Sequence, residues 1–143
     1  MGRDEELVRE ANERFYESLR LGDLDRMIAV WSSREELCCV HPGWEEPLVG
    51  RAAVVDSWER IFAHGGKVHV ESEDEHVVVA GDTAIAILIE EVYDGDGVVV
   101  GAAQATNVFV REPGGWFMIH HHASPLLRKR AGRSRPPGPV TLN

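Results

Sequence analysis

The sequence predicts an α+β domain, in which three N-terminal helices pack on one face of a curved antiparallel sheet. Apolar residues recur at helical spacing as far as His64 and at every second position from Lys67. Three glycine-containing turn signals divide the second half of the chain into four long segments. Helices followed by an antiparallel meander are typical of an α+β fold, and 143 residues fit one domain.

A single apolar stripe predicts the first helix, from Asp4 to Arg20. Its members are four residues apart: Leu7, Ala11, Phe15 and Leu19. Gly22 ends this helix, and Asp23 is placed as the N-cap of a short second helix. The inward side of the second helix carries Leu24, Met27, Ile28 and Trp31. The two helices therefore meet at a tight corner.

A short strand and a third helix complete the first half of the chain. The strand runs from Leu37 to His41 and delivers His41 into the turn Pro42-Gly43-Trp44. Gly50 opens the helix, and Gly65-Gly66 closes it. A histidine at a Pro-Gly turn, next to a helix with aromatic residues, is typical of the mouth of a pocket.

The period of two predicts four long strands. Their expected ranges are 67–79, 83–93, 98–111 and 116–124. The connections between them have the length of hairpin turns, so that neighbouring strands are antiparallel.

Side-chain alternation assigns residues to the two faces of each strand. One face of the third long strand carries Gly101, Ala103, Ala105, Asn107 and Phe109. We expect the small residues of this row to leave a hollow, of which this face is the wall. The inward row expected in the second long strand is apolar and ends in a carboxylate: Ile85, Ile87, Ile89 and Glu91. The last strand places Trp116, Met118, His120, His122 and Ser124 on one face and Phe117, Ile119, His121 and Ala123 on the other.

Charge and composition indicate a cytoplasmic protein with no nucleic-acid or membrane partner. The five bases after Pro125 leave ten bases against 24 acids in residues 1–124, a charge of −14 that repels phosphate backbones. We expect residues 1–124 to form the domain and residues 125–143 a flexible, basic, Pro-rich tail. No secretion signal or membrane-length apolar run is present. Adjacent Cys38 and Cys39 point to opposite strand faces and suit a reducing compartment.

Several motifs together resemble the NTF2-like superfamily of cone-shaped α+β domains. They are Val-His-Pro-Gly-Trp at 40–44, Val-Gly-Arg at 49–51, Thr-Asn-Val-Phe-Val at 106–110 and His-His-Ala-Ser at 121–124. The chain is similar in particular to the SnoaL-like branch and to the association domain of calmodulin-dependent kinase II, over residues 4–124. The resemblance implies the fold, but not one function, because this fold hosts isomerases, cyclases, dehydratases and oligomerisation domains.

The related ketosteroid isomerases suggest roles for individual residues. Their general-base position corresponds to His41, and their oxyanion acid corresponds to Asn107. Their oxyanion tyrosine corresponds to Phe15, and Tyr16 is turned by about 100° around the helix. The isomerase constellation is therefore incomplete, and the resemblance does not imply steroid isomerisation.

We expect a small-molecule site without a cofactor. The candidate catalytic residues are His41 as general base, Asn107 as donor to an enolate oxygen, and His122. The candidate ligand-binding residues are Phe15, Trp31, Trp44, Trp58, Phe62, Glu91, Ala105, His120 and Ser124. Such a site suits an isomerase, a cyclase or a dehydratase that acts beside a carbonyl group.

Two other interpretations stay open. A zinc site would combine His41, His120 and His122. The alternative is a buried network of histidines that binds no metal. A non-catalytic association or ligand-binding module would instead pair its subunits through the outer sheet face, and a homodimer is expected for enzyme and module alike. The strip expected to form the dimer interface comprises Val100, Ala102, Gln104, Thr106, Val108 and Val110.

Overall fold

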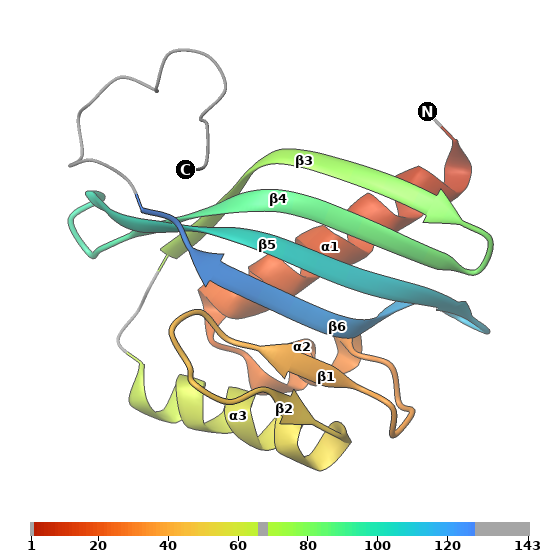
Figure 1. Ribbon diagram of the computed structural model, residues 1–143, viewed down its shortest axis with the longest axis horizontal. Coiled ribbons are helices and arrows are strands. Elements are labelled where there is room, and N and C mark those ends of the chain that lie inside the picture. Colours follow the sequence, from red (N-terminus) through yellow and green to blue (C-terminus); the bar gives the residue numbers. More distant parts are fainter. Residues whose placement is uncertain (1, 66–68, 128–143) are drawn as a thin grey trace.

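The computed structural model describes residues 2–65 and 69–127, which form three helices and one six-stranded sheet (Figure 1). The helices are α1 (Arg3–Leu21), α2 (Leu24–Val30) and α3 (Arg51–His64). The strands are β1 (Cys38–Val40), β2 (Leu48–Val49), β3 (His69–Ala80), β4 (Thr83–Tyr93), β5 (Val99–Glu112) and β6 (Gly115–Pro125). The α+β fold class is confirmed. The start of the first long strand, at 67–68, and the tail from 128 onward lie outside the described residues.

The N-terminal helices turn where the sequence predicts. Gly22 ends α1 with a φ of 63°, a left-handed conformation that glycine adopts without strain. The Asp23 carboxylate accepts a hydrogen bond from the backbone N–H of Arg26 and caps α2. Figure 1 shows α1 crossing behind the long strands, while α2 and α3 lie at the β1–β2 end. The face of the sheet that packs on α1 is called the inner face below, and the opposite one the outer face.

The sheet has the strand order β2-β1-β6-β5-β4-β3. The predicted hairpins pair β3, β4, β5 and β6 antiparallel, whereas β1 lies parallel to β6. The two-residue strand β2 was not predicted, because so short an apolar segment carries no periodicity. Its pairing with β1 covers that edge of the sheet.

A β-bulge changes the faces of the last strand. Val108 pairs with His120 and Phe109 pairs with Met118, so that Ile119 is an extra residue in β6. Trp116 and Met118 face inward as one set, but beyond the bulge the inward residues are His121 and Ala123. The expectation that a single face carries the whole row was wrong. Because of the bulge, His120, His122 and Ser124 lie on the outer face.

The inward side of β4 is also the reverse of the expected one. Ala84, Ala86, Leu88 and Glu90 are buried, whereas Ile85 and Ile87 are each 40% exposed. Glu91 therefore lies toward the outer face. The β-branched isoleucines of β4 lie on the outer face, and alanines lie on the side that α1 approaches. Hydrophobicity alone therefore did not identify the side that faces the core.

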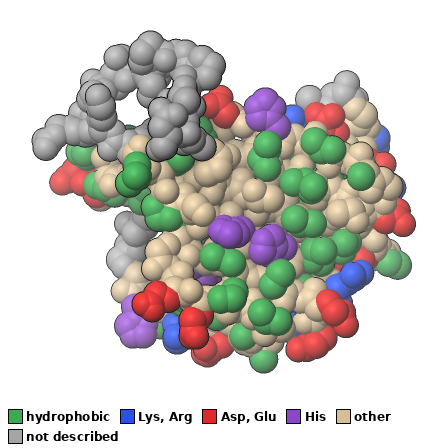
Figure 2. Space-filling view, in the orientation of Figure 1, with side chains coloured by type: hydrophobic (Ala, Val, Ile, Leu, Met, Phe, Trp, Pro, Cys, Tyr) green, Lys and Arg blue, Asp and Glu red, His purple; other side chains and the backbone are tan. Residues whose placement is uncertain are grey.

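The outer face carries apolar side chains and histidine near its middle and charged groups mainly along its rim (Figure 2). Val100 is 61% exposed and Val78 is 59% exposed. Within the predicted interface strip, however, Ala102 and Val110 are buried in the single chain. The Ala102 carbonyl accepts a hydrogen bond from Leu126. In residues 2–65 and 69–127, no helix has the length and hydrophobicity needed to cross a membrane.

Candidate functional site

Five polar side chains meet between α1 and the inner face. This inner polar cluster comprises Asn12, Tyr16, Glu90, Asn107 and His121. Asn12, Tyr16 and Asn107 are fully buried, and Glu90 is the most exposed member, at 5%. Buried polar groups are stable only when they are hydrogen-bonded.

Continuous hydrogen bonds connect the cluster. The Asn107 Nδ2 donates to Asn12 Oδ1 at 2.8 Å and to the Tyr16 hydroxyl at 3.1 Å. Tyr16 in turn donates to Glu90 Oε2 at 2.7 Å. His121 Nδ1 lies 2.6 Å from Asn107 Oδ1, an acceptor only, so Nδ1 carries the proton. Asn107 therefore connects one helix and two strands.

Glu90 and His121 form an unusual pair, with Glu90 Oε2 at 4.0 Å from His121 Nε2. Burial raises the pKa of Glu90 to about 7, against a smaller lowering by the Tyr16 hydrogen bond. Burial, with the neighbouring histidines, lowers the pKa of His121 to about 3. At neutral pH the imidazole is uncharged and the carboxyl group is partly protonated. The pair is then a proton donor and a proton acceptor rather than a salt bridge.

His41 lies on the same side as the cluster but is bonded elsewhere. Its Nε2 lies 2.9 Å from the Ser57 hydroxyl, whose own proton goes to the Val54 carbonyl, so His41 donates to Ser57. The thiol of Cys39 lies 3.8 Å from the other ring nitrogen. Burial, with a smaller effect from Arg60, lowers the pKa of His41 to about 4.

Aromatic rings surround the two histidines. The Trp58 ring centroid lies 4.6 Å from that of His41 and 6.1 Å from that of His121, and Phe15 packs on His121 at 4.8 Å. Trp44, at 37% exposure, covers His41 from the outside at 4.7 Å. The Trp58 Nε1–H is buried and has no hydrogen-bond partner among residues 2–65 and 69–127. Leaving such a donor unpaired costs about 1–3 kcal/mol.

The structure brings together part of the predicted site. Phe15, Trp58, Ala105 and Asn107 lie on the inner side with His41, and Phe62 contacts Trp58 with its ring. Trp31 is buried at the end of α2, where its backbone bridges to Met118. The outer-face positions of Glu91, His120, His122 and Ser124 separate them from this group.

Side chains fill the expected hollow. His41 and Asn107 do lie on one side of the sheet, but the ring of His121 is in contact range of both. His121 is 2% exposed and Asn107 is fully buried, so no water-sized space separates them. The zinc alternative is not supported by position, because His41 is on the inner side and His120 and His122 are on the outer face.

Sequence reasoning missed four members of the inner polar cluster as site residues: Asn12, Tyr16, Glu90 and His121. Tyr16 lay one position from the expected tyrosine, yet it is Tyr16 whose hydroxyl binds Glu90 and Asn107. A polar residue at an inward position of α1 was the available signal for Asn12. Glu90 and His121 were hidden by the reversed face of β4 and by the bulge of β6.

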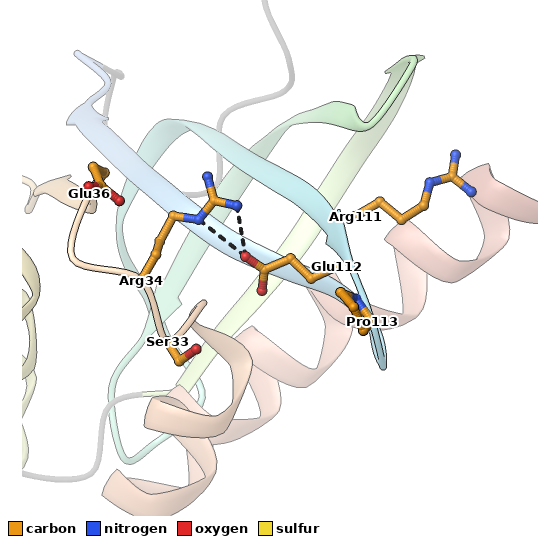
Figure 3. Close-up of a pocket in the computed structure, with 6 residues that line it drawn as sticks. All are labelled: Ser33, Arg34, Glu36, Arg111, Glu112 and Pro113. Atoms are coloured by element: carbon orange, nitrogen blue, oxygen red, sulfur yellow. Dashed lines mark hydrogen bonds and ion pairs between the residues drawn. The ribbon is translucent and has the colours of Figure 1, made fainter.

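A shallow groove of about 640 Å³ lies apart from this cluster, beside the β5–β6 turn (Figure 3). It is lined by Ser33, Arg34, Glu36, Arg111, Glu112 and Pro113. Figure 3 shows Arg34 extended toward Glu112, to which its Nη2 bonds at 2.9 Å. Arg111 likewise pairs with Asp4 and Asp82. Because both guanidinium groups are neutralised, the part of the groove formed by described residues offers no free cation to an anionic ligand.

Comparisons with known proteins support the fold. A proposed dehydratase of the NTF2-like family from Streptomyces avermitilis is 38% identical, with a TM-score of 0.79 over 87% of this chain and 97% of that chain. A proposed calcium/calmodulin-dependent protein kinase type II association domain from Thiobacillus denitrificans is 38% identical, with a TM-score of 0.77 over 82% and 93% of the respective chains. A kinase II hub from S. rosetta is 23% identical, with a TM-score of 0.72 over 88% and 98%, and shares the fold.

The F-box protein SKIP8 of Arabidopsis thaliana is 27% identical over 116 residues. That match covers 81% of this chain and 48% of SKIP8, so the chain spans about half the length of this curated relative. The model of the SnoaL-like domain matches residues 8–128, which confirms the resemblance drawn from the motifs. The chain belongs to the SnoaL-like family and has the NTF2-like fold.

Proposed function

We propose that the chain binds a small carbonyl compound at the inner face and moves protons beside its carbonyl group, as a dehydratase or an isomerase without a cofactor. The observation that carries this proposal is the buried pair of Glu90 and His121, with Oε2 and Nε2 4.0 Å apart. Replacing such a pair by apolar residues is often stabilising, and strongly shifted pKa values concentrate at functional sites. Similarity to a proposed NTF2-like dehydratase supports the same reaction class.

Dehydration of a 3-hydroxyacyl compound would use both groups. His121 Nε2 takes a proton from the carbon next to the carbonyl, and the electrons of that C–H bond form the new double bond. The C–O bond breaks, and protonated Glu90 gives its proton to the departing hydroxyl, which leaves as water. The proton on His121 then returns to Glu90, so the pair is ready for another cycle.

The remaining groups would support this step. The unpartnered Trp58 N–H would donate to the carbonyl oxygen as its negative charge increases. Both nitrogens of His41 already face protein groups, so the base is His121 and not His41. Binding requires side chains to move, and the partly exposed Trp44 over His41 marks the route from the surface.

The N-acetylcysteamine thioester of 3-hydroxybutyrate tests the proposal, with the enoyl product followed by absorbance. We expect turnover that decreases about tenfold per pH unit above pH 7, because Glu90, with a pKa of about 7, must hold a proton. His121→Asn should lower kcat/KM at least roughly 100-fold. His122→Asn, the adjacent change on the outer face, should leave it unchanged.

This pair of variants also distinguishes the site residue that the structure indicates, His121, from the one that the sequence predicted, His122. Equal losses in both variants, or a rate that increases above pH 7, would contradict the proposed roles. A wild-type chain that forms no enoyl product would exclude the dehydratase.

We also propose that the outer face joins two copies of the chain. The supporting observation is the exposure of Val78, Ile85, Ile87 and Val100 on a sheet face whose charges lie mainly at the rim (Figure 2). The similarity to a proposed association domain, at 38% identity, supports a second copy of the chain as the partner of this face.

Ile87→Lys is expected to weaken dimerisation at least tenfold in analytical ultracentrifugation, because it buries a charge without a partner in the interface. Ile87 is 40% exposed and pairs with Thr106 in the middle of the outer face. Val49→Lys provides the control, because Val49 is 74% exposed on the edge strand β2. A dimer that tolerates Ile87→Lys would place the interface elsewhere.

A further inference from the structure

We propose that Glu75 is a positioning residue, which acts through Asn12 and Asn107 to keep the proton of His121 on Nδ1 and leave Nε2 free toward Glu90. The catalytic meaning of this inference rests on the proposed function. The proton position itself is a property of the folded chain and can be measured without any substrate.

A bulge in β3 delivers Glu75 to the inner side. Glu73 pairs with Ile89 and His76 pairs with Ile87, so two residues of β3 stand opposite one of β4. Asp74, within the bulge, has a φ of 54°, a conformation that is uncommon outside glycine, asparagine and aspartate. Without the extra residue, strict alternation would place Glu75 on the same face as Glu73, away from α1.

Glu75 presents acceptors only. Its Oε1 accepts from Arg9 Nη1 at 2.8 Å, and the two side chains are 23% and 30% exposed. Arg9 also bonds to Glu5 one turn earlier, at 3.1 Å. A carboxylate held by a guanidinium group has no proton to donate. Whatever approaches Glu75 Oε2 must therefore be a donor.

The group that approaches is the amide of Asn12. Asn12 Nδ2 donates to Glu75 Oε2 at 2.5 Å, which turns its Oδ1 toward the interior. An asparagine amide has one donor end and one acceptor end, so fixing one end fixes the other. The acceptor end of Asn12 therefore faces Asn107.

Asn107 repeats this polarity one step deeper. Its Nδ2 supplies both hydrogens, one to Asn12 Oδ1 and one to the Tyr16 hydroxyl. Its Oδ1 is then the only end left for His121 Nδ1, at 2.6 Å. Because this oxygen can only accept, the proton of neutral His121 lies on Nδ1.

The far ring nitrogen of His121 is thereby left without a proton. Nε2 lies 4.0 Å from Glu90 Oε2, where the proposed reaction requires a base. The opposite tautomer would put a hydrogen on Nε2 and remove the lone pair. A carboxylate near the surface therefore determines which nitrogen is basic in the interior.

Two-bond ¹H–¹⁵N NMR spectra of protein labelled at histidine test this directly. We expect His121 in the wild type to show a protonated Nδ1 and an unprotonated Nε2. Glu75→Leu should give a mixture of the two tautomers, since Asn12 is then free to turn over. Glu73→Leu, on the outer face of the same strand, should leave the spectrum of His121 unchanged. A wild-type His121 that carries its proton on Nε2 would overturn the proposal at once.

A charge swap, Arg9→Glu with Glu75→Lys, keeps the ion pair but replaces the acceptor by a donor. Asn12 and Asn107 should then both reverse, and His121 should become mainly Nε2-protonated, with kcat/KM for the thioester at least tenfold lower. If the charge-swap variant gives the dispersed spectrum of a folded chain and His121 is still protonated on Nδ1, the role of Glu75 is refuted. This test applies even if Glu75→Leu does not fold. The charge swap could reverse the tautomer of His121 while the wild type forms no enoyl product. That result would support the positioning role of Glu75 and reject the proposed dehydratase function.

Discussion

Asn107→Ala is expected to lower the free energy of unfolding by about 3–5 kcal/mol. The side chain is fully buried and bonds to three other buried side chains. Truncation leaves Asn12 Oδ1 and His121 Nδ1–H without their partner, and each buried group left unsatisfied costs about 1–3 kcal/mol. The small cavity that remains adds to this cost. Urea unfolding followed by circular dichroism measures the change.

Thr106→Ala is the control for this experiment, because Thr106 is the preceding residue of β5 and is only half-buried on the outer face. We expect it to cost less than about 1 kcal/mol. If the two variants lose similar stability, the hydrogen bonds of Asn107 do not hold α1, β5 and β6 together as described.

Glu90→Gln is expected to stabilise the protein increasingly as the pH rises, by on the order of 2–3 kcal/mol at pH 8 relative to pH 5. The ordinary pKa of the Glu90 carboxyl is 4.5, and burial raises it to about 7 in the folded chain. Between these values the folded state keeps a proton that the unfolded state has lost, so raising the pH destabilises the wild type. Glutamine carries no such charge and still accepts from Tyr16.

Urea unfolding of wild type and variant between pH 5 and pH 8 isolates this effect, because the buried histidines are common to both chains and cancel in the difference. The matched control is Glu91→Gln, one residue along and toward the outer face, which leaves the Glu90 carboxyl in place. A stability difference that does not grow with pH would place Glu90 in contact with water. The variant should at the same time lose dehydratase activity, a trade of function for stability.

The sequence was sufficient for the order of the three helices and the four long strands. Helix α1 ends at Gly22 and α3 begins after Gly50, as the glycine and capping signals predict. The inward row of β5 is also as expected from Ala103 to Phe109, because this stretch keeps strict alternation. Each of these features is decided by residues close in the chain, which is why a local pattern could predict it.

The site itself depended on decisions that are not local. Whether His121 or His122 faces inward is set by one extra residue, Ile119, that β6 accommodates opposite β5. The inward side of β4 is set by the approach of α1, which favours Ala84 and Ala86 over the larger isoleucines. Neither a bulge nor the approach of a helix changes the apolar pattern in the sequence of the strand concerned. Alternation alone therefore predicted the adjacent residues, His122 in place of His121 and Glu91 in place of Glu90.

The parallel pairing of β1 with β6 has a consequence for the way the chain reaches this structure. Cys38 and His120, which contact each other across this pair, are separated by 82 positions, and the Asn12–Asn107 bond spans 95. Contacts of such long range slow folding, because the ends of a long loop must meet before they gain any stabilisation. A ribosome must therefore synthesise nearly the whole domain before the first helix finds its polar partners, and we expect refolding in milliseconds to seconds rather than microseconds.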